Sequence, residues 1–76
     1  MSMGEKLEVR KTADGFEIVG NRAGLRGLAE ICLQLAALPE NEEVARTLGN
    51  HYHFADYMNN LEAGSVPMII LYKPDL

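Results

Sequence analysis

Two histidines, His51 and His53, are the residues best placed to do chemistry. Side chains two apart on a β-strand share a face, so the two imidazoles could chelate a metal, with Asp56 close by in sequence. Structural zinc needs four ligands and catalytic zinc three. The single cysteine, Cys32, lies in an apolar helical run, where we expect a buried thiol. We therefore expect no metal site within one chain and interpret the histidines as half-exposed strand residues.

Other catalytic and cofactor-binding patterns are missing from the sequence. No combination of serine or cysteine nucleophile with histidine and aspartate is recognisable. The spacing of Gly15, Gly20, Gly24 and Gly27 does not follow the G-x-G-x-x-G or P-loop patterns that cradle phosphates. The sequence thus predicts neither an enzyme nor a cofactor.

Length and composition predict one small domain spanning residues 1–76. The chain has 76 residues, of which 47% are apolar and 24% charged, ordinary values for a globular protein. No stretch approaches the ~18 apolar residues that a membrane span requires. The N-terminal residues, MSMGEK, lack the basic region and apolar core of a signal peptide, so we expect a cytoplasmic location and no membrane partner.

The net charge of −4 is concentrated in the second half of the chain. Residues 1–38 contain five acidic and five basic side chains, whereas residues 39–76 contain six acidic side chains against Arg46 and Lys73. An acidic chain without a basic stripe is a poor nucleic-acid binder. It would suit a basic protein partner, and the clustered Glu40, Glu42 and Glu43 could be the docking patch.

Periodicity predicts an α+β fold with the order β-β-α-β-β. Alternating residues give strands over 7–10 and 16–20, joined by an Asp-Gly turn. Asn21 is a suitable cap for a helix that ends before Pro39. Residues 39–50 are expected to form a loop with a helical turn at 44–48, and strands follow at 51–54 and 66–72. The simplest arrangement is one four-stranded antiparallel or mixed sheet with one helix packed on one face.

That arrangement predicts a core on one side of the sheet and an open apolar face on the other. Helix residues Leu25, Leu28, Cys32 and Leu35 should pack on strand residues Val9, Ile18, Phe54 and Ile70. A single helix covers only one face, which leaves a partly apolar surface for a second copy or another protein. Its residues would be Val19, Ile69 and Leu71, bordered by His51 and His53.

Several short segments resemble the immunity protein 32 family of bacterial polymorphic toxin systems. These are Ile18-Val19-Gly20-Asn21, Gly24-Leu25, Leu28-Ala29, His51-Tyr52-His53-Phe54, and Gly64-Ser65 before Ile69-Ile70. The resemblance covers about residues 7–73. It implies a cytoplasmic antidote that binds and neutralises a cognate toxin domain, and it suggests no catalytic residues. Our leading hypothesis is that such a protein works by occlusion, without a covalent step.

Two alternatives remain open. One is a small metal- or ligand-binding module in which His51 and His53 of two subunits enclose a site at a homodimer interface. The other is a small enzyme whose active site forms at a dimer seam from the same histidines and Asp56.

Overall fold

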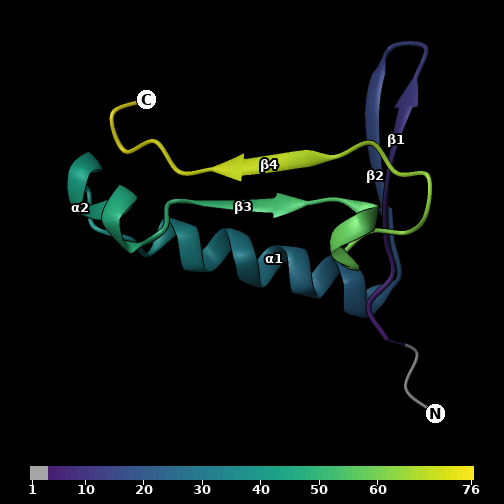
Figure 1. Ribbon diagram of the computed structural model, residues 1–76, viewed down its shortest axis with the longest axis horizontal. Helices are drawn as coiled ribbons and strands as arrows, with labels where there is room; N and C mark the ends of the chain where they lie inside the picture. Colours follow the sequence, from purple (N-terminus) through teal and green to yellow (C-terminus); the bar gives the residue numbers. More distant parts are fainter. Residues whose placement is uncertain (1–3) are drawn as a thin grey trace.

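The computed structural model describes residues 4–76 and has the predicted α+β class (Figure 1). The first three residues of the segment used to judge a signal peptide lie outside the described part. The regular elements follow one another as β1 Leu7–Thr12, β2 Gly15–Gly20, α1 Arg22–Ala36, α2 Glu42–Leu48, β3 His51–Phe54, a 3-10 turn Asp56–Met58 and β4 Met68–Leu71. The expected loop over 39–50 therefore contains a seven-residue helix, which Asn41 caps by accepting a hydrogen bond from Val44 N.

The four strands form two separate two-stranded antiparallel sheets, β1–β2 and β3–β4, so a single four-stranded sheet is not confirmed. The reason lies at the edge of β1 that does not pair with β2. There the backbone N–H groups of Glu62 and Val66 donate to the carbonyls of Leu7 and Val9, at 2.7 and 2.9 Å. The Val9 N–H in turn donates to Ser65 Oγ at 3.2 Å. The segment before β4 thus occupies the edge that a third strand would need.

Asn21 caps the start of helix α1 and also bonds Lys6, the residue before β1. Asn21 Oδ1 accepts from the N–H of Gly24 at 2.8 Å and from the N–H of Lys6 at 3.1 Å. The Asn21 N–H donates to the Lys6 carbonyl at 3.0 Å. The predicted N-cap is confirmed, and the same side chain fixes the corner between the hairpin and the helix.

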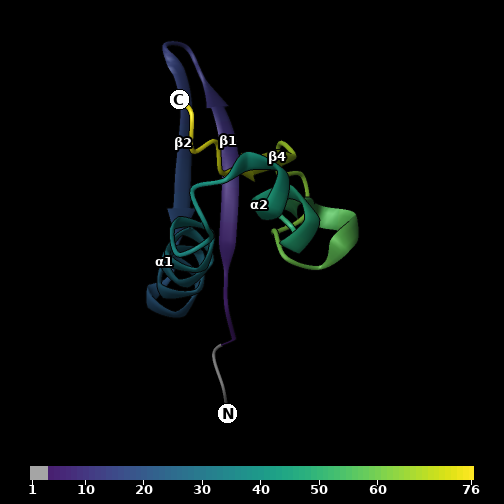
Figure 2. The same cartoon turned by 90° about the vertical axis from the view of Figure 1, so that its left-hand side faces the viewer.

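The molecule is flat, with extents of 38 × 35 × 20 Å. Helix α1 runs alongside the β3–β4 layer, and the β1–β2 hairpin crosses both at one end (Figures 1 and 2). The core lies at this crossing and contains the buried side chains of Leu7, Val9, Phe54 and Leu61. The partly buried side chains packed against them are Leu28, Ile31, Val66, Met68 and Ile70.

The predicted core is right in part. Val9, Phe54, Ile70 and the helix residue Leu28 do belong to it, and Leu35 is buried. The prediction is wrong for Leu25 and Ile18, which are 46% and 45% exposed, and for Cys32, which is also exposed. Helix α1 is rotated so that the flank containing Gly24, Gly27 and Ile31 faces inward, because the glycines allow residues 5 and 6 to approach closely.

Candidate partner-binding surface

The outer face of the β3–β4 sheet carries two histidines and two aliphatic side chains. The register pairs His51 with Leu71 and His53 with Ile69, and directly opposed residues of antiparallel strands share a face. Ile69 and Leu71 are 59% and 53% exposed. We call these four residues the outer β3–β4 face.

The opposite face of the same sheet points into the molecule. It carries Tyr52, Phe54, Met68 and Ile70, which the register also pairs across the strands. Phe54 is buried, and Met68 and Ile70 pack against the core. The predicted division of the two strands into an inner and an outer face is therefore confirmed.

The two histidines lie against each other on the outer face. Their ring centroids are 5.0 Å apart at an interplanar angle of 83°, and His51 Nδ1 is 3.2 Å from Asn50 Oδ1. Within residues 4–76, no group of three or more histidine, cysteine, aspartate or glutamate side chains is placed to hold a metal. Two imidazoles fall short of the ligand number of a zinc site in one chain.

A hollow adjoins the outer face at the end of the sheet where Phe54 pairs with Met68. Its lining includes His53 and Ile69 of the outer face, Phe54 and Met68 of the inner face, and Ala55, Tyr57 and Pro67. Tyr57 follows β3 in the 3-10 turn and is 80% exposed. Sequence reasoning treated this segment as a connection and missed Tyr57, although a tyrosine in a short exposed turn is a residue type enriched at protein interfaces.

The acidic cluster lies at the opposite end of the outer face from Tyr57. Helix α2 leads directly into His51, and its first turn contains Glu42 and Glu43 (Figure 1). Glu42 forms a salt bridge at 2.7 Å with Nζ of Lys73, which lies just beyond the end of β4. Glu40 and Glu43 are exposed and make no ion pair with any of the described side chains. They are the unneutralised part of the predicted patch.

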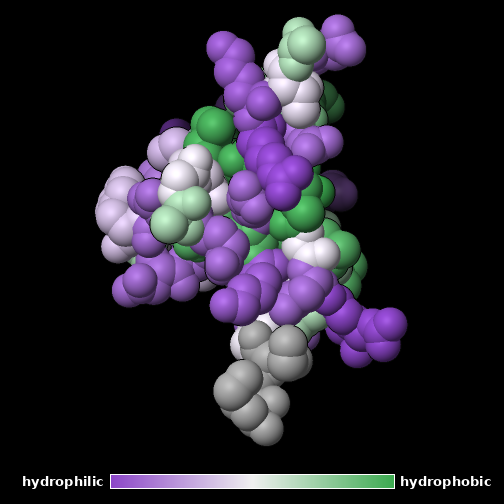
Figure 3. Space-filling model, turned by 90° about the vertical axis from the view of Figure 1, so that its right-hand side faces the viewer, coloured by the Kyte–Doolittle hydropathy of each residue, from purple (hydrophilic) through white to green (hydrophobic). Residues whose placement is uncertain are grey.

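Val19 does not lie with the other predicted contact residues. It belongs to β2, where it is paired with Glu8, next to the pair of Arg10 and Glu17. Arg10 contacts the carboxylates of Glu8 and Glu17 at 3.0 and 3.3 Å, and the hydrogen bond to Glu8 raises the pKa of the guanidinium. Figure 3 shows hydrophilic side chains along the middle of this hairpin. Val19 is thus on a charged face of a different sheet.

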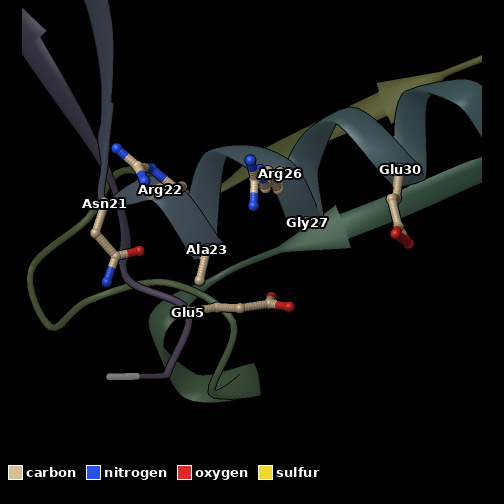
Figure 4. A pocket seen from close by; sticks show the side chains of 7 residues that line it. All are labelled: Glu5, Asn21, Arg22, Ala23, Arg26, Gly27 and Glu30. Carbon is tan, nitrogen blue, oxygen red and sulfur yellow. The ribbon is translucent and has the colours of Figure 1, made fainter. Parts of the chain in front are cut away.

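A second hollow lies at the start of α1, between Glu5, Arg22, Arg26 and Glu30 (Figure 4). The Glu5 side chain extends beneath the helix, with its carboxylate against the bare Cα of Gly27, whereas the Arg22 side chain extends away from it. The charged groups of this hollow do not converge on one point. It offers no arrangement for general acid–base chemistry or for gripping a small ligand.

Fold and surface together define a small α+β protein whose most distinctive feature is an exposed sheet face. No helix within residues 4–76 has the length and apolarity to cross a membrane. The family model for immunity protein 32 matches residues 16–74, which include β2 apart from its first residue and every later element through β4. The chain belongs to the immunity protein 32 family. No curated protein and no solved structure matches the chain.

Proposed function

We propose that this chain binds a cognate bacterial toxin domain and neutralises it by covering the toxin's functional surface, without catalysis, in the cytoplasm of the cell that makes both proteins. The family match over residues 16–74 is the observation that carries the proposal. An immunity protein of this kind needs a binding surface rather than a reaction centre.

The outer β3–β4 face is the toxin-binding surface in this proposal. Ile69 and Leu71 are both more than half exposed although they are large and aliphatic. Specific interfaces have an apolar centre, aromatic anchors and a polar rim. In the proposed complex Ile69 and Leu71 form the centre, Tyr57 is the aromatic anchor, and the two histidines belong to the rim.

Electrostatics favours a basic toxin surface. Glu40 and Glu43 lie exposed beyond one end of the outer face, and the whole net charge of −4 arises in residues 39–76. Opposite charges on two partners accelerate their encounter more than they strengthen the final complex. The acidic cluster therefore serves the rate of association, and the apolar centre serves the lifetime of the complex.

The decisive experiment uses the cognate toxin domain, which we expect to be encoded next to this gene. Toxin binding by calorimetry and rescue of cells that express the toxin should both be lost in the double variant Ile69→Lys, Leu71→Lys. The matched control is Leu33→Lys, because Leu33 is 70% exposed on α1, away from the outer face. Circular dichroism should show that all variants are folded.

Two results would overturn the proposed surface or function. Unchanged toxin binding by the double variant would exclude the outer β3–β4 face. Failure of the wild-type protein to bind or protect would exclude the immunity function itself. Metal analysis of protein purified without a histidine tag tests the metal-binding form of the alternative, in which His51 and His53 of two chains share a site, since that form requires bound metal.

A further inference from the structure

The exposed area of the chain exceeds that of a compact monomer. A folded monomer of 8.4 kDa exposes about 4,600 Å², whereas this chain exposes 5686 Å². Its radius of gyration is 13.8 Å, against about 11 Å for a compact chain of this length. The excess is roughly 1,000 Å², and a standard protein interface buries about 800 Å² on each partner. An area of that size is comparable with one interface of ordinary size.

A second apolar surface lies on the other side of the molecule from the outer β3–β4 face. Helix α1 turns its outward flank to solvent, with exposed Leu25, Ala29, Cys32 and Ala36. Beside it, Phe16 and Ile18 on β2 are 65% and 45% exposed. We call these six residues the helix–hairpin surface.

The two parts of the helix–hairpin surface are continuous. A Cβ added to Gly20 would meet Leu25 Cγ at 3.1 Å, so the face of β2 that contains Gly20 borders Leu25. Ile18 and Phe16 share that face because side chains alternate along a strand. Figure 2 shows α1 and β2 together on one side of the β3–β4 layer. Figure 3 views the molecule from the side opposite to Figure 2, and there hydrophobic atoms border the polar band on the right.

We propose that the helix–hairpin surface pairs with the same surface of a second copy of this chain, in a two-fold dimer with antiparallel α1 helices. Leu25, Ala29, Cys32 and Ala36 repeat at intervals of four, three and four residues, the spacing at which paired helices make contact. A two-fold axis midway between residues 29 and 32 sets Leu25 of one copy opposite Ala36 of the other. The large side chain thus meets a small one at both ends of the contact.

The distribution of charge favours a second copy of the chain, and not the toxin, as the partner of this surface. The helix–hairpin surface lies wholly within residues 1–38, whose acidic and basic side chains are equal in number. Two copies can therefore approach there without net repulsion. Residues 39–76 carry a net negative charge, so this segment of one copy would repel the same segment of another copy. The outer β3–β4 face, which lies in this segment, is therefore the poorer site for self-pairing. The two surfaces can be occupied at the same time because they lie on opposite sides of the β3–β4 layer.

The mass in solution tests the dimer directly. Light scattering at tens of micromolar should give twice 8.4 kDa for the wild type and a single chain mass for the variant Ala29→Glu, Ala36→Glu. Both alanines are exposed, so glutamate there should leave the isolated chain folded, as circular dichroism will show. The matched control, Gln34→Glu, adds a carboxylate to another exposed position of the same helix and should remain a dimer. A monomeric wild type, or a variant that stays dimeric, would overturn the proposal.

Cys32 gives an independent measurement that needs no substitution. Its thiol is exposed in the single chain and would lie near the two-fold axis of the dimer. Modification by a thiol reagent should therefore slow at least tenfold when the protein concentration is raised above the dissociation constant of the dimer. A labelling rate that does not depend on protein concentration would contradict this interface even if the protein were dimeric.

Discussion

Gly24 of helix α1 lies so close to the carbonyl oxygen of Lys6 that no side chain fits between them. The same carbonyl accepts the N–H of Asn21, and the side chain of Asn21 binds the N–H groups of both Lys6 and Gly24. The helix start and the beginning of β1 are thus joined by backbone contacts that depend on a glycine. This contact fixes the rotation of α1 about its axis.

Replacing Gly24 by alanine should destabilise the protein, although alanine is the better helix former by about 1 kcal/mol. The added Cβ would collide with main-chain atoms of Lys6, which cannot move without disturbing β1. We expect a net loss of about 2 kcal/mol, as for other overpacked sites, measured by urea denaturation.

Gly27→Ala is the matched control for that experiment. There the new Cβ would meet the carboxylate of Glu5, with Oε1 at 2.7 Å, and this flexible side chain can turn away. The substitution should be neutral or stabilising by up to about 1 kcal/mol. Equal effects at both glycines would contradict the close contact between α1 and Lys6.

Leu28→Ala should lower the free energy of unfolding by about 2 kcal/mol, near the lower end for buried leucines. Leu28 packs against the core but remains partly exposed. The same substitution at Leu33, which is 70% exposed, should change stability by no more than about 0.5 kcal/mol. Similar thermal melts for the two variants would mean that a different flank of α1 faces the core.

Removing the two unpaired glutamates before and within α2 should slow association with the toxin. The variant Glu40→Gln, Glu43→Gln loses two charges while the bond between Glu42 and Lys73 is kept. We expect a several-fold lower association rate at low ionic strength and little difference at high salt, measured by stopped-flow fluorescence. The control removes two charges from the hairpin, as Asp14→Asn and Glu17→Gln. A change of the same size in this control would show that only net charge matters.

Lys73 should titrate above the usual range of a lysine. The hydrogen bond to Glu42, followed by the charge of nearby Asp75, raises the pKa of its ammonium group. This group therefore favours folding below the unfolded-state pKa of about 10.4, and the contribution is lost as the pH rises through the folded-state value. An NMR titration of Glu42→Gln should give a lower pKa for Lys73 than in the wild type. An unchanged value would mean that the contact does not persist in solution.

The sequence predicted the elements better than their assembly. The Asp-Gly turn, the Asn21 cap and the alternation in residues 51–54 are local signals, and the structure contains the hairpin, helix and strand that they predict. The edge of β1 could not be predicted in this way, because its partners are backbone groups and Ser65 in an irregular segment. Such contacts leave no periodic pattern.

The sequence did not predict which flank of α1 faces the core, for a different reason. More than half of the residues of this helix are apolar. The hydrophobic pattern is therefore compatible with either flank facing inward. The flank that faces inward contains Gly24 and Gly27. Glycine has no side chain, so these positions do not contribute to a hydrophobic pattern. The flank with Leu25 and Cys32 looked like the core because it too is apolar, and its exposure became visible only in the structure.

Strand β1 lies outside the region matched by the family model, which begins at residue 16, yet it supplies Leu7 and Val9 to the core. It is held along one edge by β2 and along the other by Glu62, Ser65 and Val66. A chain cut back to the matched region would lack the strand that lies between β2 and residues 62–66, together with two core side chains, so it should fold only when that strand is supplied. Residues 5–12 could be supplied for this purpose as a separate peptide. The domain could then serve as a split reporter whose two pieces regain a folded protein only when they meet.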